Sequence, residues 1–128
     1  MKKISFDFDG VLEFQSVQDY AKKLMEKGIE VHIVTSRYKD PNTYPFRCDH
    51  NDLFEVVDKL GIEKENIHFT EMQDKYTFFN NNLGFIWHLD DDHLEVTLIN
   101  YNSKVKGIWS LSGNFEHECN ELLNTSNE

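Results

Sequence analysis

The chain alternates short, continuous apolar runs with longer segments in which apolar residues recur every three or four positions. The continuous runs are rich in β-branched and aromatic residues, which is typical of buried strands. They predict strands at residues 3–8, 30–35, 66–69, 85–89 and 105–109. The periodic segments have the spacing of amphipathic helices. They predict helices at residues 16–27, 50–60, 74–82 and 92–101, and a short C-terminal helix that frays from about residue 120 to 128.

The ends of the first two predicted helices carry recognisable signals. Ser16 and Asp49 are expected to cap their N-termini, because a short side-chain oxygen can accept a hydrogen bond from an N–H group in the first turn. Gly28 and Gly61 are expected to end the same helices, because glycine readily takes the left-handed conformation just past a helix. In the segment 92–101, one face is shared by Leu94, Thr97, Leu98 and Tyr101.

Strands and helices alternate along the whole chain, and this order predicts the fold class. We expect one α/β domain over residues 1–128, a three-layer, Rossmann-like arrangement with about five parallel strands and helices on both faces. In sheets of this kind, ligands bind beyond the carboxyl ends of the strands. The residues that directly follow each strand are therefore the candidates for a functional site.

Composition and charge exclude some classes of protein. The chain has 13 Lys and Arg residues against 23 Asp and Glu residues, a net charge of −10, and 39% of its residues are hydrophobic. It is too apolar for an intrinsically disordered protein. The negative charge argues against a protein that wraps nucleic acid, because such binding depends on Lys and Arg contacts to phosphates. A small, local phosphate site is still compatible with this charge.

The chain carries no sequence signal for a membrane or for secretion. No apolar run approaches the roughly 20 residues that cross a bilayer, and the segment 1–7 lacks the apolar stretch of a signal peptide. We therefore expect a cytoplasmic protein that has no membrane partner. Cys48 and Cys119 lie far apart and match no metal-ligand spacing, so we expect free thiols and no disulfide-linked partner.

Polar residues gather directly after the predicted strands. In chain order they are Asp7, Asp9 and Gly10, then Thr35, Ser36 and Arg37, then Lys75 at the start of a helix, then Asp90, Asp91 and Asp92. Taken singly, each group is compatible with ordinary turn or capping chemistry. Taken together, they place two sets of carboxylates at one edge of the sheet, where mutual repulsion calls for a cation between them. Hard oxygen ligands suit Mg²⁺, and Mg²⁺ with a lysine and a hydroxyl forms a site for a phosphoryl group.

In order and spacing, these residues resemble the motifs of the haloacid dehalogenase (HAD) superfamily of phosphohydrolases. The resemblance covers residues 3–109. The matching segments are ISFDFDGVL for the first motif, VHIVTSR with Thr35 for the second, Lys75 for the third, and FIWHLDD with Asp90 and Asp91 for the fourth.

The resemblance implies roles for the catalytic residues. Asp7 would be the nucleophile that forms an aspartyl-phosphate, and Asp9 would be the general acid and then the general base. Thr35 and Lys75 would hold the phosphoryl group. The implied activity is Mg²⁺-dependent hydrolysis of a phosphomonoester.

The resemblance also implies a metal site and a substrate. Mg²⁺ would bind the side chain of Asp7, the backbone carbonyl of Asp9, and either Asp90 or Asp91, a choice that the sequence leaves open. Residues expected to contact the phosphorylated substrate, whether a nucleotide, a nucleic-acid end or another phosphate ester, are Gly10, Ser36 and Arg37.

Three alternatives accompany this interpretation. Response-regulator receiver domains use similar residues, but their phosphorylated Asp closes the third strand, and here that strand runs into Phe69 and Thr70. A looser resemblance to the 3′-phosphatase domain of phage polynucleotide kinase, through Arg37 and the segment 112–115, implies action on nucleic-acid ends. The third alternative is a catalytically idle domain that binds Mg²⁺ or a partner.

Three further expectations concern the surroundings of the site. The short connections after Gly10 and between residues 61 and 84 leave no room for the cap domain of many HAD enzymes, so we expect a capless protein. The loop 36–48 should project beside the site, where its aromatic residues either stack on bases or pack under the domain. Three of the histidines are expected inside strands as core residues, namely His32, His68 and His88.

Overall fold

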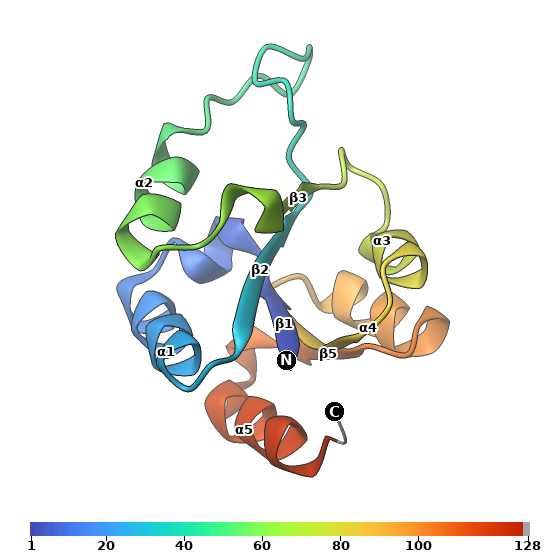
Figure 1. Ribbon diagram of the computed structural model, residues 1–128. Coiled ribbons are helices and arrows are strands. Elements are labelled where there is room, and N and C mark those ends of the chain that lie inside the picture. The colour runs from blue at the N-terminus through green and yellow to red at the C-terminus, as the bar shows by residue number, and fades with distance from the viewer. Residues whose placement is uncertain (127–128) are drawn as a thin grey trace.

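Five parallel strands form the centre of the protein, in the order β3–β2–β1–β4–β5 (Figure 1). The computed structural model describes residues 1–126. The strands are β1 (Lys3–Phe6), β2 (Glu30–Thr35), β3 (Ile67–Phe69), β4 (Phe85–Asp90) and β5 (Lys106–Trp109). The predicted α/β class with an all-parallel sheet is confirmed, and each predicted strand is present within about two residues of its expected bounds.

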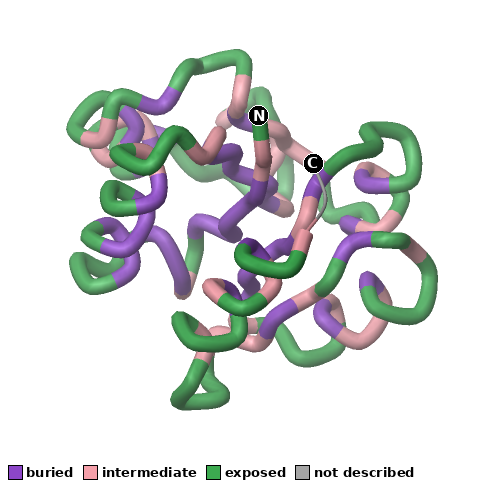
Figure 2. Tube along the Cα trace, turned by 60° about the horizontal axis from the view of Figure 1, so that its bottom comes forward, coloured by how far each residue is buried: buried purple, intermediate pink, exposed green. Residues whose placement is uncertain are grey.

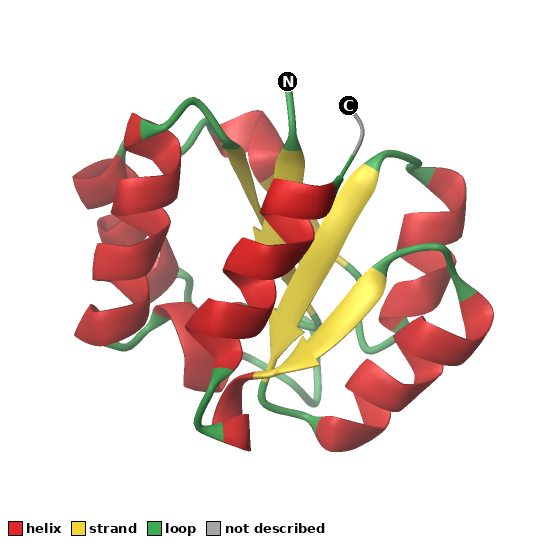
Figure 3. Ribbon diagram, turned by 90° about the horizontal axis from the view of Figure 1, so that it is seen from below, coloured by secondary structure: helices red, strands yellow, loops and turns green. Residues whose placement is uncertain are grey.

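Helices cover both faces of the sheet, which gives the three layers seen in Figure 3. One face carries α1 (Gln15–Glu26), α2 (Asn51–Leu60) and α5 (Phe115–Thr125). The other face carries α3 (Lys75–Asn81) and α4 (His93–Asn102). Short helical turns lie at η1 (Phe8–Leu12), η2 (Lys64–Asn66) and η3 (Ser110–Ser112).

The two faces of the sheet differ in polarity. Because side chains alternate along a strand, Ile4 and Phe6 of β1 point into the large apolar core under α1, α2 and α5. Ser5 of β1 and His88 of β4 point to the opposite face, and both are fully buried. Figure 2 shows buried segments running through the centre of the molecule, with exposed turns around them. The face under α3 and α4 therefore contains buried polar groups that lead towards the ends of β1 and β4.

The predicted helix ends agree with the structure at their C-termini more closely than at their N-termini. Gly28 and Gly61 follow α1 and α2 with φ angles of 84° and 80°, as expected. The prediction that Ser16 caps α1 is wrong, because the helix begins one residue earlier and Phe14 occupies the capping position. The backbone carbonyl of Phe14 already accepts hydrogen bonds from the next turn, so η1 sets the start of the helix. Asp49 accepts a hydrogen bond from the N–H of Asn51, although His50 occupies the capping position of α2.

Helix α4 turns its predicted apolar face away from the sheet. The helix packs through Val96 and Ile99, which are buried, whereas Leu94 and Tyr101 are 65% and 85% exposed. Its backbone lies directly on β5, where a Cβ atom on Gly107 would come within 2.8 Å of the Val96 carbonyl oxygen. This close contact fixes the rotation of α4 and leaves the Leu94 face free.

The C-terminal segment is helical to Thr125, where the sequence predicted fraying from about residue 120. Cys119 and Leu123 are buried against the sheet, and the Lys2 ammonium donates a hydrogen bond of 2.6 Å to the Leu123 carbonyl. These contacts hold the last turns of α5. Residues 127 and 128 of the predicted frayed end lie outside the described part.

Within residues 1–126, the connection after β1 contains η1 and α1, and the connection after β3 contains α3. Neither connection carries a cap domain, as the sequence predicted. None of the helices in that range is long and apolar enough to cross a membrane. Both cysteines are free thiols, Cys48 exposed and Cys119 buried.

Two of the strand histidines form a chain of hydrogen bonds on the face under α3. The His32 ring stacks on the His68 ring at 5.2 Å, with Nδ1 of His32 2.9 Å from Nε2 of His68. The other His32 nitrogen lies 2.6 Å from a Glu30 carboxylate oxygen. His32 is buried and His68 half-buried, which fits the expectation of core histidines. Burial, then the charges of His32 and Lys3, lowers the pKa of His68 from 6.5 to about 4.

We expect the hydrogen-bonded residues Glu30, His32 and His68 to make the free energy of unfolding depend on pH in the acid range. Because the folded pKa of His68 is lower than its unfolded value, the unfolded chain binds the extra proton between about pH 6.5 and pH 4. The free energy of unfolding should therefore fall as the pH is lowered through this window. Urea unfolding at several pH values measures this dependence. The free energy of unfolding should change less steeply with pH in His68→Phe than in the wild type, whereas the exposed variant His117→Gln should keep the wild-type pH dependence.

Candidate active site

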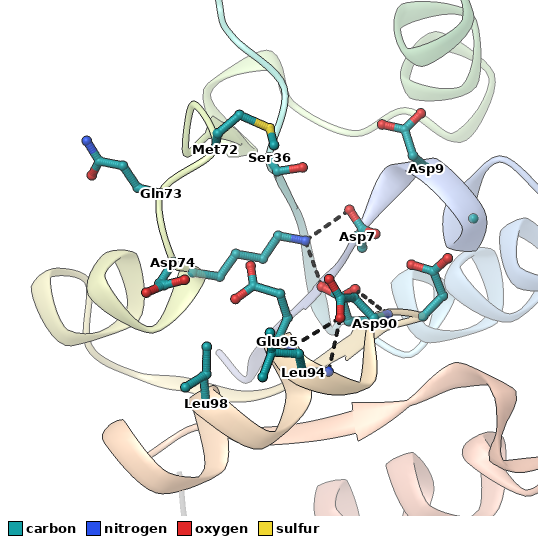
Figure 4. Close-up of a pocket in the computed structure, with 14 residues that line it drawn as sticks. Asp7, Asp9, Ser36, Met72, Gln73, Asp74, Asp90, Leu94, Glu95 and Leu98 are labelled. Carbon is teal, nitrogen blue, oxygen red and sulfur yellow. Dashed lines mark hydrogen bonds and ion pairs between the residues drawn. The ribbon is translucent and has the colours of Figure 1, made fainter. Parts of the chain in front are cut away.

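The carboxyl ends of β1, β2 and β4 open into one cavity of about 520 Å³, beside the N-terminus of α3 (Figure 4). The order of the strands places β1 between β2 and β4, so residues that follow these three strands become neighbours. The cavity is lined by predicted site residues from each of them, including Asp7, Asp9, Gly10, Ser36, Lys75, Asp90 and Asp91. The structure thus brings most of the predicted site together.

A buried lysine lies between two buried carboxylates. The Lys75 ammonium is 3.0 Å from Oδ1 of Asp7 and 2.6 Å from Oδ2 of Asp90. The register of β1 and β4 pairs Ser5 with His88, which brings Asp7 and Asp90, two residues further along each strand, side by side. Lys75 reaches them from the first residue of α3, on the same face of the sheet. A single cation therefore contacts both acids.

Asp91 brings a third carboxylate to the same point, and Gly10 makes room for it. One carboxylate oxygen from each of Asp7, Asp90 and Asp91 lies within 4.8 Å of the others. Gly10 has a φ angle of 77°, and a Cβ atom there would collide with the Asp91 carboxylate. Gly10 is thus required both for its backbone conformation and for the approach of Asp91. The sequence predicted Gly10 as a substrate contact, and its space-making role appears only in three dimensions.

The electrostatics of this cluster show an excess of negative charge. Burial raises the pKa of Asp7 well above its usual value, and the Asp90 and Asp91 carboxylates add to the rise, although Lys75 opposes it. Burial alone would raise the pKa of Asp90, but the His88 hydrogen bond and the Lys75 charge lower it. Burial would likewise lower the pKa of Lys75, but the two carboxylates outweigh it and raise the pKa. Lys75 is therefore charged and Asp90 is ionised, while the ionisation of Asp7 is opposed.

The donor set of the cluster fits a divalent cation that prefers oxygen ligands. Asp7, Asp90 and Asp91 offer only carboxylate oxygens, which suit Mg²⁺ rather than a softer metal. A bound cation would also relieve the repulsion that raises the pKa of Asp7. Both Asp90 and Asp91 are close enough to Asp7 to take part, so the two candidates that the sequence left open both belong to the cluster.

Below the acids, a buried histidine links Asp90 to β1. Nε2 of His88 is 2.7 Å from Oδ2 of Asp90, and its Nδ1 is 2.8 Å from the Ser5 hydroxyl. Complete burial lowers the pKa of His88, so the ring is neutral. Because the ionised Asp90 only accepts, the ring donates from Nε2, and Nδ1 accepts from Ser5. The sequence predicts a core position for His88, and the signal for its link to Asp90 is that a Ser and a His interrupt two apolar strands.

We expect His88→Leu to affect both stability and metal binding. The change leaves the Ser5 hydroxyl without an acceptor and one Asp90 carboxylate oxygen without the His88 donor, which should lower the free energy of unfolding by about 1–3 kcal/mol. Substitution of a residue that hydrogen-bonds to a metal ligand typically lowers metal affinity by about 10- to 100-fold. The affinity for Mg²⁺ should therefore weaken within that range. Calorimetric titration with Mg²⁺ and urea unfolding check the two effects. Equal Mg²⁺ affinity in His88→Leu and in the exposed His117→Gln would contradict the second.

Asp9 is held by an arginine at the edge of the cavity. Nε and Nη2 of Arg37 donate to the two carboxylate oxygens of Asp9 at 2.9 and 2.7 Å. The same guanidinium donates to both oxygens of Asp52 at 3.0 and 2.8 Å, and it lies over the Phe8 ring. The Arg37 side chain is only 8% exposed, whereas that of Asp9 is 53% exposed. Arg37, predicted to contact substrate, thus has two carboxylate partners in this structure.

The two predicted hydroxyl groups occupy different positions. Ser36 lines the cavity, and Figure 4 shows it near Asp7. Thr35 is fully buried, does not line the cavity, and accepts a hydrogen bond from the N–H of Arg37. Its carbonyl also accepts the N–H of Thr70 at 2.8 Å, which ties the end of β2 to the turn after β3. The role of Thr35 in holding a phosphoryl group stays a prediction.

Glu95 also lines the cavity, although it is not among the site residues that the sequence predicts. Burial raises the pKa of its carboxyl, which accepts a hydrogen bond from the backbone N–H of Lys75. Its Oε1 atom is buried and has no hydrogen-bond partner among the described residues. The spacing of Asp92 and Glu95 is that of an ordinary capping box, which gives no sign that Glu95 faces a site.

The loop 36–48 projects from the end of β2, as Figure 1 shows. The Tyr38 and Phe46 rings stack on each other at 5.9 Å, and Tyr44 is 80% exposed. His50 anchors the base of the loop through its Nε2 atom, 2.9 Å from the Tyr38 carbonyl oxygen. Two aromatic rings of the loop therefore pair with each other, and a third faces solvent.

Comparison of the chain with models of known protein families, with curated proteins and with solved structures finds no match.

Proposed function

We propose that the protein is a Mg²⁺-dependent phosphomonoesterase that acts through an aspartyl-phosphate on Asp7. The observation that carries the proposal is the junction of three carboxylates, from Asp7, Asp90 and Asp91, with the Lys75 ammonium in contact with Asp7. The HAD-type motifs along the chain support the same chemistry. A carboxylate, a charged lysine and a divalent-cation site at one end of an open cavity suit attack on a phosphoryl group.

In the first step, a carboxylate oxygen of Asp7 attacks phosphorus and the bond between phosphorus and the ester oxygen breaks. The leaving oxygen takes a proton from the Asp9 carboxyl, so the products are an alcohol and the aspartyl-phosphate. In the second step, Asp9 removes a proton from water, which attacks phosphorus and releases phosphate from Asp7. Lys75 neutralises charge on the phosphoryl oxygens, and bound Mg²⁺, held by the three acids, would supply further charge neutralisation.

Proton transfer by Asp9 requires an exchange of its hydrogen bonds. Both of its oxygens accept from Arg37, so Asp9 has to release at least one of these bonds to reach a substrate oxygen. Asp52 shares Arg37 and continues to hold the guanidinium when Asp9 turns. This arrangement gives the general acid a defined resting position beside the cavity.

The proposal is tested by measuring phosphate release from small phosphomonoesters with Mg²⁺ and after its removal with a chelator. We expect turnover only with the metal and only with Asp7 intact. Asp7→Asn is the test variant, and Asp58→Asn, an exposed change on α2, is the matched control. Metal-independent release, or equal release by Asp7→Asn, would contradict the mechanism. Mg²⁺ binding without turnover of any ester would favour the idle binding domain.

A further inference from the structure

The cavity has an apolar wall next to the carboxylates. Met72, from the turn between β3 and α3, is 55% exposed, and Leu94, on α4, is 65% exposed. Leu98 lies one turn after Leu94 on the same helix face, and all three side chains line the cavity. Figure 4 shows Met72 beside Ser36, with Leu94 and Leu98 across the site. Large apolar side chains on both sides of a polar site contribute little to the core.

The backbone of the turn holds Met72 in this position. Glu71 and Met72 have φ angles of 56° and 66°, a left-handed conformation that residues other than glycine seldom adopt. The turn is fastened to the end of β2, because the N–H of Met72 donates to the Ser36 carbonyl at 2.8 Å and that of Glu71 to the Arg37 carbonyl at 3.2 Å. Strained residues concentrate where function requires them, and here the strain places an apolar side chain at the mouth of the cavity.

The charge around the cavity is negative beyond the cluster that would hold a metal. Of the described residues that line the cavity, only Lys75 is a cation. Its ammonium contacts Asp7 and Asp90. Arg37, just outside, is paired with Asp9 and Asp52. A divalent cation and Lys75 would together balance the three clustered carboxylates, and three further acids line the cavity, namely Asp74, Asp92 and Glu95. A second anionic group on a substrate would face these acids.

We propose that the site selects monoesters whose leaving group is apolar and carries no further negative charge. This inference rests on the proposed phosphatase function and names its substrate class. The phosphoryl group lies against Asp7 and Lys75, while the leaving group packs between Met72 and the Leu94 face of α4. The apolar wall attracts such a leaving group by removing its surface from water. The surrounding acids repel a leaving group that carries a phosphodiester or a carboxylate.

The decisive comparison uses two esters that differ only at the far end of the leaving group. Hexyl phosphate and 6-phosphohexanoate have the same ester linkage and chain length, but the second ends in a carboxylate. We expect kcat/KM to be higher for hexyl phosphate by on the order of 10-fold or more. Ethyl phosphate, whose leaving group offers less apolar surface to the wall, should be hydrolysed less efficiently than hexyl phosphate.

Variants of the apolar wall test whether the leaving group binds there. Met72→Ala should lower kcat/KM more for hexyl phosphate than for ethyl phosphate. Leu94→Lys should narrow the ratio between hexyl phosphate and 6-phosphohexanoate by about 3- to 10-fold, because it adds a cation beside the leaving group. Leu83→Lys, an exposed position that does not line the cavity, is the matched control and should keep the wild-type ratio.

The outcomes separate this inference from the function on which it rests. Equal kcat/KM for the two six-carbon esters, with both rates lost in Asp7→Asn, would overturn the inference and leave the phosphatase standing. Faster release from a 3′-phosphorylated oligonucleotide than from thymidine 3′-monophosphate would also overturn it, in favour of nucleic-acid ends. No release from any ester would overturn both.

Discussion

Asp7→Asn should abolish phosphate release and, at the same time, stabilise the metal-free protein. The loss of the nucleophile should reduce the rate by at least about 10³-fold, because Lys75 and the remaining acids cannot form the covalent intermediate. The fold should gain stability because Asp7 is a buried acid whose ionisation is opposed by burial and by Asp90 and Asp91. We expect a gain of about 0.5–2 kcal/mol, the usual range for a stabilising substitution.

The pH dependence of this gain distinguishes it from a general improvement in packing. The pKa of Asp7 is raised in the folded protein, so the folded state binds more protons than the unfolded state at pH values between the unfolded and the folded pKa of Asp7. The stability of the wild type therefore falls as the pH rises through the folded pKa, and Asp7→Asn lacks this loss. The difference in unfolding free energy between the two proteins should grow with pH in the absence of metal.

Thermal unfolding with and without Mg²⁺ measures both effects. Mg²⁺ should stabilise the wild type more than Asp7→Asn, because the variant has lost one carboxylate of the metal cluster. Asp58→Asn should follow the wild type in every measurement. A metal-free Asp7→Asn protein that is less stable than the wild type would show that the Asp7–Lys75 contact outweighs the repulsion among the acids.

Lys75→Met should be the most destabilising single change in the site. The Lys75 ammonium contacts Asp7 and Asp90, and both acids are buried, so its removal leaves two uncompensated carboxylates side by side. Breaking a buried ion pair from one side costs about 3–5 kcal/mol, and we expect a loss in that range without metal. Methionine has a similar length, so the change removes charge while leaving little empty volume.

Urea unfolding of a double-mutant cycle tests the reason for this loss. The double variant Lys75→Met/Asp7→Asn should be destabilised less than Lys75→Met alone, because one of the two abandoned acids is neutral. Mg²⁺ should restore part of the stability of Lys75→Met by replacing the missing positive charge. Lys22→Met, an exposed change on α1, should alter stability by less than about 0.5 kcal/mol. A Lys75→Met loss as small as that of Lys22→Met would refute the argument.

Several elements could be predicted from the sequence because their causes are local. The apolar runs and the helical periodicity gave the order of strands and helices, and glycines at 28 and 61 gave the ends of α1 and α2. The polar residues after successive parallel strands had to meet at one edge of the sheet, so Asp7, Lys75 and Asp90 could be selected as neighbours before any coordinates.

Other features depended on which face each residue turns towards and on what lies opposite. The stripe at Leu94 and Leu98 has helical spacing, but the contact of α4 with Gly107 decides that it borders the cavity and not the core. Gly10 looks like an ordinary turn residue until Asp91 is placed against it. Arg37 looks available to a phosphate until Asp9 and Asp52 are found on its guanidinium.

The sequence by itself determined the α/β class, the strand order along the chain and the chemistry available at the strand ends, because these follow from local pattern and from the direction of parallel strands. Only the tertiary structure decided that Ser5 and His88 support Asp90 from below and that Met72 and Leu94 form an apolar wall. These contacts join residues far apart in the chain through sheet register and helix rotation, which no local pattern encodes.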